Sequence, residues 1–222
     1  KLDFNMLHPI EPKFLPKKRL KFLIVDPAGD KSVQKGTGND DWAIMCFGVR
    51  PSMDELGNSD VYLEDIMLDT MGLSEAIDAT VQMYMRNGRI QVLGVEKVGN
   101  DTTYEHIKKA LRAKGRHIEI GKGQRLGSMV LLAPAERDKN RRIEAALSWP
   151  LNNGKLFYST AIDPSKIESI KTEMNKYPFF HVDALDAWAY LYDILANKFS
   201  FQLEDDEEEE EGQELYSVQG RS

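Results

Sequence analysis

The order of hydrophobic periodicities along the chain constrains its fold more than any other feature. Three apolar, strand-like segments come first, at residues 21–26, 42–49 and 61–67, and turn-forming residues separate them. Helical and strand-like segments then alternate over residues 74–198. Consecutive strands favour an antiparallel meander, whereas alternation with helices favours parallel strands. The sequence therefore predicts an α/β fold with a mixed β-sheet and α-helices on its faces.

The alternating part contains recognisable helix and strand signals. Helical spacing of apolar residues, with capping residues or glycine at the ends, predicts helices at 74–86, 102–114, 137–149, 164–176 and 182–198. Shorter apolar runs predict strands at 90–96, 117–120 and 156–158. The glycine-rich stretch 121–127 is expected to be a basic loop.

Composition divides the chain of 222 residues into three parts. Residues 1–20 contain Pro9, Pro12 and Pro16 and are expected to be an extended linker. Residues 21–200 are long enough for one compact domain. Residues 201–222 include an unbroken acidic run at 204–211 and are expected to be a disordered tail.

Several classes of protein are excluded by residue content. No apolar run approaches the length that a membrane-spanning helix needs. The single cysteine, Cys46, excludes a disulfide framework and, with only four histidines, a Cys/His zinc site.

The net charge of −7 comes from the tail, whereas residues 108–142 hold eleven basic and three acidic residues. That segment could bind a polyanion, or it could form ordinary solvated helix faces.

Three acidic residues stand at the ends of predicted elements. Asp26 and Glu96 each end an apolar strand, and Asp183 begins the last helix. Neighbouring central strands would bring the first two acids together at one edge of the sheet. If all three converge, a divalent cation would offset their repulsion, and oxygen-only ligands suit Mg²⁺ or Mn²⁺. Each acid could instead be a turn former, a surface charge or a charge favoured at a helix N-terminus.

Five short motifs carry a resemblance to a known family. They are Leu-Ile-Val-Asp26-Pro-Ala, Asp40-Asp41-Trp-Ala-Ile, Gly-Val-Glu96, Lys139-Asn-Arg-Arg-Ile143 and Phe179-Phe-His-Val-Asp183-Ala-Leu-Asp186-Ala-Trp-Ala-Tyr. Over residues 20–198 the chain resembles the nuclease domain of the large terminase subunit of viruses such as tailed bacteriophages. The resemblance implies an RNase H-like fold with helices on both faces of the sheet. It also implies a metal-dependent endonuclease that cuts concatemeric double-stranded DNA during genome packaging.

The resemblance assigns roles residue by residue. The family's catalytic acids, which hold two Mg²⁺ or Mn²⁺ ions, match Asp26, Glu96 and Asp183. Positions that often hold auxiliary acids match Asp41 and Asp186. Of these two, Asp186 is expected to be a further metal ligand. One position departs from the family pattern, because Val182 stands where the family commonly has the first of two adjacent acids. Basic residues are expected to bind DNA phosphates at Lys122, Arg125, Lys139, Arg141 and Arg142.

The resemblance also implies a setting and partners. The chain has no Gly-x-x-x-x-Gly-Lys-Ser/Thr loop, so residues 1–20 are interpreted as the linker from a missing N-terminal ATPase domain. Double-stranded DNA, the ATPase domain, the small terminase subunit and the portal are the expected partners, in the host cell cytoplasm and not in the mature virion. Two alternatives stay open: another RNase H-like nuclease such as a junction resolvase, or a DNA-binding and assembly module with dormant nuclease activity.

Overall fold

A computed structural model of the chain describes residues 2–27, 41–50, 58–97, 102–120, 128–133, 139–180 and 182–196. The strands are β1 (His8–Ile10), β2 (Leu20–Asp26), β3 (Trp42–Arg50), β4 (Asp60–Asp69), β5 (Val92–Glu96), β6 (Glu119–Ile120), β7 (Ser128–Leu132) and β8 (Leu156–Ser159). The α-helices are α2 (Leu73–Arg86), α3 (Thr103–Ala113), α4 (Lys139–Asn152), α5 (Pro164–Lys176) and α6 (Asp183–Ala196). Two short 3₁₀ helices, η1 (Phe4–Met6) and η2 (Pro12–Phe14), flank β1.

The described strands form one mixed sheet in the order β1-β8-β4-β3-β2-β5-β7-β6. β2, β3 and β4 make the antiparallel meander that the sequence predicted. β5 pairs with β2 in parallel, and β7 pairs with β5 in parallel. The two strands that end in acids are therefore neighbours at the centre of the sheet.

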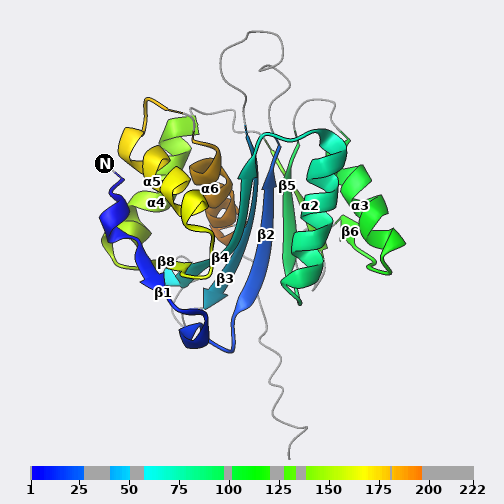
Figure 1. Ribbon diagram of the computed structural model, residues 1–222, viewed down its shortest axis with the longest axis horizontal. Coiled ribbons are helices and arrows are strands. Elements are labelled where there is room, and N and C mark those ends of the chain that lie inside the picture. The colour runs from blue at the N-terminus through cyan, green and yellow to red at the C-terminus, as the bar shows by residue number, and fades with distance from the viewer. Residues whose placement is uncertain are drawn as a thin grey trace, which may run out of the picture.

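Helices cover both faces of this sheet, as predicted. Figure 1 shows α4, α5 and α6 on one side of the strands and α2 and α3 on the other. Successive side chains of β2 point to opposite faces of the sheet, which explains this arrangement. Phe22 and Ile24 point into one core, and Leu23 and Val25 point into the other. The sheet thus separates two hydrophobic layers.

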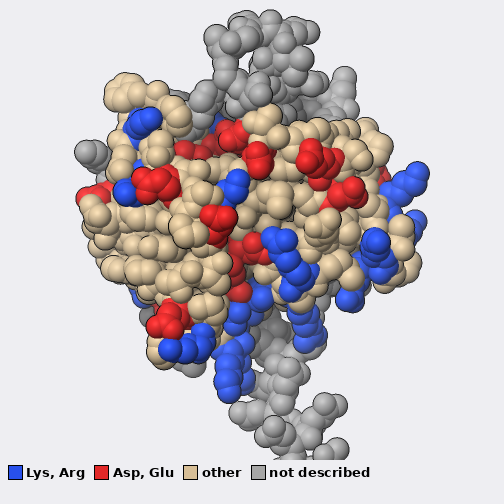
Figure 2. All heavy atoms as spheres, in the orientation of Figure 1, with Lys and Arg blue, Asp and Glu red and all other residues tan. Residues whose placement is uncertain are grey.

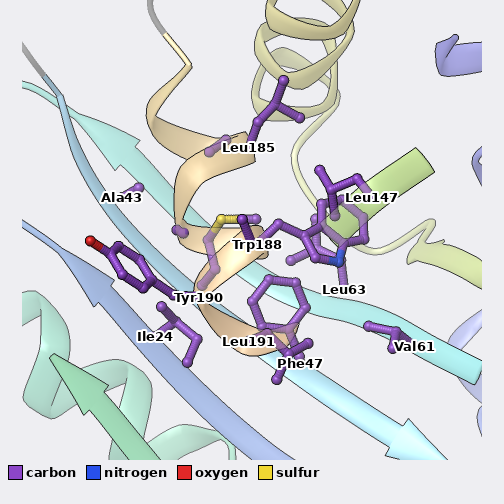
Figure 3. Close-up of a cluster of buried hydrophobic side chains, with 14 of the residues drawn as sticks. Ile24, Ala43, Phe47, Val61, Leu63, Leu147, Leu185, Trp188, Tyr190 and Leu191 are labelled. Carbon is purple, nitrogen blue, oxygen red and sulfur yellow. The ribbon is translucent and has the colours of Figure 1, made fainter. Parts of the chain in front are cut away.

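Helix α6 lies at the middle of the larger core. It packs against β2, β3, β5, α4 and α5. Figure 3 shows Trp188 of α6 among apolar side chains, and its ring centroid lies 5.4 Å from that of Phe47. Gly94 allows α6 to approach β5 closely, because a Cβ atom there would lie 2.9 Å from Cδ1 of Ile194. The last turns of α6 therefore lie close against β5.

Helix α6 carries polar residues on one side, and two of them are buried. Asp186 is 3% exposed and Tyr190 is 1% exposed. They are buried because this side of α6 faces the ends of the central strands and the basic start of α4.

The N-terminal segment is part of the fold, which corrects the prediction of an extended linker over residues 1–20. β1 pairs in parallel with β8 and adds a strand to the edge of the sheet. Leu2 and Leu7 are buried in the main core at 1% and 3% exposure. Burial of these two leucines stabilises the docked segment. Whether an ATPase domain precedes it stays a prediction.

Two other details differ from the sequence predictions. β7 was not predicted, because its five residues follow directly on a glycine-rich stretch and carry no clear periodicity. Helix α4 ends later than expected and continues through Pro150. Trp149, near the end of α4, is 46% exposed, whereas Trp42, Trp188 and Cys46 are buried. Among the described residues, no helix is long and apolar enough to cross a membrane.

Candidate metal-dependent nuclease site

The ends of β2 and β5 bring two of the three predicted acids into contact. The register pairs Val25 with Val95, so Asp26 and Glu96 come next on adjacent parallel strands. The two carboxyl groups share a hydrogen bond. Asp26 is 5% exposed. A pair of carboxyl groups at a sheet edge, one of them buried, is the arrangement that the sequence predicted for the ends of these strands.

Burial raises the pKa of Asp26 well above its ordinary value, and the contact with Glu96 and the charge of Asp186 raise it further. Two carboxylates in contact cannot both be ionised cheaply unless a positive charge neutralises them. The ammonium group of Lys139 opposes this shift but does not cancel it. The positive charge near the Asp26–Glu96 pair is therefore not enough to neutralise it.

Helix α6 brings Asp183 and Asp186 to the same end of the sheet. Both lie in the first turn of the helix, where the helix dipole favours acidic residues. A salt bridge of 3.4 Å joins Lys139 Nζ to Asp183 Oδ1, and another of 3.0 Å joins it to Asp186 Oδ2. Burial alone would lower the pKa of Lys139, but the charges of Asp186, Asp26 and Asp183 raise it, so this side chain stays an ammonium group.

Arg142 and Tyr190 link the two pairs of acids. The guanidinium group of Arg142 donates a hydrogen bond to Asp186 and lies 3.7 Å from the ring centroid of Tyr190. The Tyr190 hydroxyl donates a hydrogen bond of 2.5 Å to Glu96 Oε1. Burial and this hydrogen bond raise the pKa of Tyr190, so it keeps its proton and remains a donor. The sequence around Tyr190 carries no signal of this contact, because the contact arises only from tertiary packing.

Glu173 of α5 is a second functional residue that the sequence analysis missed. Its carboxyl oxygens accept hydrogen bonds from the backbone N–H groups of Ala184 and Leu185, at 3.3 and 3.1 Å. It therefore caps the helix that begins at Asp183. One pattern could have revealed Glu173. It is an acidic residue that lies, at helical spacing, between Ile170 and Met174, and both of these residues face the core.

The other predicted site residues lie around this cluster or outside the described residues. The backbone N–H of Asp41 donates to Asp183 Oδ2 at 3.3 Å, but its carboxylate accepts a hydrogen bond from Thr70. Val182 is 5% exposed and packs in the core. Lys122 and Arg125, the tail at 201–222 and His181 lie outside the described residues.

The basic segment 108–142 does not act as one surface within its described part. Figure 2 shows basic side chains gathered at the right and lower parts of the visible face, and α3 lies at the right of Figure 1. Lys139 and Arg142, by contrast, are engaged with the acids of α6. Arg141 is exposed on α4. Of the predicted DNA contacts, Lys139 and Arg142 thus have an internal role as well.

The donor set fits a divalent metal only in part. Carboxylate oxygens are the ligands that Mg²⁺ and Mn²⁺ prefer, and the uncompensated Asp26–Glu96 pair supplies them. Among the residues that the structure describes, however, no three His, Cys, Asp or Glu side chains lie close enough together to hold a metal ion. Asp183 and Asp186 are paired with cationic side chains instead. They would join a metal on Asp26 and Glu96 only after Lys139 moves aside.

Comparison with known proteins supports the same fold. The crystal structure of the large terminase nuclease from the thermophilic phage G20c, with bound magnesium, matches with a TM-score of 0.50 and 11% identity, covering 86% of this chain and 94% of that one. The chain has the fold of a terminase nuclease domain. The predicted RNase H-like fold class is thereby confirmed.

Two further solved structures match less closely. The human cytomegalovirus terminase nuclease domain, soaked with manganese and bound to an inhibitor, has a TM-score of 0.48 and 15% identity over 86% of this chain and 90% of that one. The yeast mitochondrial Holliday junction resolvase has a TM-score of 0.42 and 10% identity over 86% and 84%. Neither a family model nor a curated protein sequence matches the chain.

Proposed function

We propose that this chain is a metal-dependent endonuclease that hydrolyses phosphodiester bonds of double-stranded DNA with Mg²⁺ or Mn²⁺ ions. The observation that carries the proposal is the contact between the buried Asp26 and Glu96 at the ends of two central strands, beside the acidic first turn of α6. A buried carboxyl group with a raised pKa, in contact with a second carboxyl group, is typical of a site that binds a cation. The fold shared with the phage terminase nuclease supports the same conclusion.

In this proposal each residue has a distinct task. Asp26, Glu96 and Asp183 would hold the metal ions, and Asp186 would add a further oxygen ligand. When bound, the metals supply an activated water for attack on the phosphate and stabilise the leaving oxygen. Lys139 neutralises the acids of α6 until the site is filled. Tyr190 orients the carboxylate of Glu96 through its hydrogen bond.

We also propose that the natural role is that of a terminase nuclease domain, which cuts concatemeric DNA during packaging in the cytoplasm of a virus-infected host cell. An ATPase domain in the same full-length protein would then supply the motor, and the small subunit and portal would be further partners. The five sequence motifs that resemble this family support the role.

One observation favours a second candidate, a DNA-binding and assembly module with a dormant nuclease. Asp183 and Asp186 are already neutralised by Lys139 and Arg142. A site that keeps its own counter-ions has less need of a metal. Metal binding separates the two candidates, because a dormant site would bind Mn²⁺ weakly and without effect on DNA.

The test is digestion of supercoiled plasmid by the full chain with EDTA, Mg²⁺ or Mn²⁺. Cleavage should require metal and should fall about 100-fold or more in Asp26→Asn, because that variant loses a carboxylate ligand. Asp60→Asn is the matched control, since Asp60 begins β4 at the opposite end of the sheet and pairs with Lys155. It should cleave like the wild type.

Thermal unfolding in the presence and absence of Mn²⁺ gives a second readout. Wild-type protein should be stabilised by the ion and Asp26→Asn should not. Absence of cleavage with both metals, together with no stabilisation by either, would contradict the nuclease proposal and favour the assembly module.

A further inference from the structure

A pair of aromatic residues lies exposed next to the candidate site. Phe179 is 93% exposed and Phe180 is 44% exposed, in the turn that joins α5 to α6. We call residues 177–180 the aromatic turn. Single exposed apolar residues are common on protein surfaces, but two consecutive phenylalanines leave a large apolar area in water. The feature therefore calls for a ligand that covers it.

The aromatic turn is held in place at its start. The Tyr177 hydroxyl donates a hydrogen bond to the backbone carbonyl of Asn140, which follows Lys139 in α4. The backbone N–H of Phe179 donates to the carbonyl of Lys176 at 2.9 Å. These contacts fix the turn on both α5 and α4. A ligand that binds Phe179 therefore gains contact area at a small cost in ordering the protein.

The aromatic turn is also close to the acids that would hold metal. Asp183 is the fourth residue after Phe179, so even a fully extended chain would place their Cα atoms no more than about 14 Å apart. Bases in a stacked duplex are spaced about 3.4 Å along the axis. A phosphate bound at the acidic site would therefore lie within about four base pairs of Phe179.

Positive charge accompanies the two aromatic rings. The ammonium group of Lys176, in the last turn of α5, lies 4.5 Å from the ring centroid of Phe180. Lys176, directly before the aromatic turn, thus places an ammonium group beside its exposed aromatic rings. Proteins that bind nucleic acids use this combination, in which the cation contacts a phosphate and the ring stacks on a base or enters between two bases.

We propose that the aromatic turn is a DNA contact of the candidate nuclease site, in which Phe179 stacks on or wedges between bases and Lys176 binds a neighbouring phosphate. This inference rests on the proposed function. It assigns a specific role to residues that the catalytic proposal does not use. It also predicts that the enzyme locally unstacks the duplex near the bond that it cuts.

The test measures binding of the full chain to a fluorescent DNA duplex in EDTA at fixed salt, so that no cleavage occurs. Phe179→Ala should weaken binding by about 5- to 150-fold, the range that loss of one base–aromatic stack produces. Phe179→Trp should retain binding. Duplexes that carry 2-aminopurine should report unstacking with the wild type and not with Phe179→Ala.

Phe14→Ala is the matched control. Phe14 is 64% exposed, and the ammonium group of Lys13 lies 4.9 Å from its ring centroid. It lies in η2, shortly before β2 begins, whereas Asp26 lies at the other end of β2. The control should bind DNA like the wild type, and both variants should unfold at the wild-type temperature because both side chains are exposed.

The outcomes separate this inference from the proposed function. Weaker binding by Phe179→Ala alone supports the DNA contact, even if the wild type cleaves no DNA with any metal. Wild-type affinity in Phe179→Ala overturns it and assigns the turn to another occupant such as a protein, even if cleavage is metal-dependent. A wild-type chain without measurable affinity for DNA overturns it as well.

Discussion

Replacing Glu173 by glutamine tests how the start of α6 is held. Glu173 is 5% exposed, and burial raises its pKa from an ordinary value of 4.5 to about 8, although two backbone N–H groups favour the ionised form. Between these two pH values the unfolded chain releases the proton and the folded protein keeps it. The free energy of unfolding should therefore fall as pH rises through this range and level off above about pH 8.

The size of the effect follows from the shift. Each pKa unit corresponds to about 1.4 kcal/mol, so a shift of this size removes about 4 to 5 kcal/mol of stability between about pH 4.5 and pH 8. Glutamine resembles the protonated acid and does not titrate. It turns its NH₂ group toward one of the two backbone donors, which subtracts about 1 kcal/mol at every pH. Glu173→Gln should thus start slightly less stable near pH 5 and become more stable than the wild type near pH 8.

Urea unfolding of both proteins at several pH values between about 5 and 8 measures this difference. Asp26 also titrates in the folded protein, but it is present in both, so its contribution cancels in the comparison. Parallel profiles would refute the reasoning, because they would mean that Glu173 titrates alike in the folded and unfolded chains.

Two further substitutions probe the packing and the charge of the site. Gly94→Ala should lower the free energy of unfolding by about 1 to 3 kcal/mol, because the new Cβ would lie 2.9 Å from Ile194 Cδ1 and 3.1 Å from Leu132 Cδ1. Urea denaturation checks this prediction. Unchanged stability would mean that α6 can shift freely. Lys139→Met should raise the affinity for Mn²⁺ about 5-fold, because a partly exposed ion pair with Asp186 is worth about 1 kcal/mol. Calorimetric titration checks this, with Lys139→Arg as the control. Weaker Mn²⁺ binding by Lys139→Met would show that the ammonium group helps to hold the site.

The sequence predicted the parts of the site that depend on the order of elements. Asp26 and Glu96 end apolar runs, and a parallel pairing of central strands then places them side by side without further information. For Asp183, the local pattern gives only its place in the first turn of α6. Its position relative to Asp26 and Glu96 depends on how α6 packs against the sheet.

The rest of the site depends on how elements pack. Lys139 and Arg142 looked like DNA contacts, since a basic cluster carries no sign of which acid it will meet. Glu173 caps a helix that begins ten residues later, and only the packing of α5 against α6 creates that contact. The N-terminal segment was misjudged for a similar reason. Its prolines are a local signal, whereas the burial of Leu2 and Leu7 is a property of the folded core.

The pairing of β1 with β8 has a consequence for folding during synthesis. His8 lies opposite Phe157, so the ribosome must add about 150 residues after β1 before this strand can find its partner. At roughly 5 to 20 residues per second, this wait lasts on the order of 10 to 30 s. During that time Leu2 and Leu7 have no complete core to enter and remain available to chaperones or to other nascent chains. This edge of the sheet thus forms only after β8 has been made, although β1 is made about 150 residues earlier.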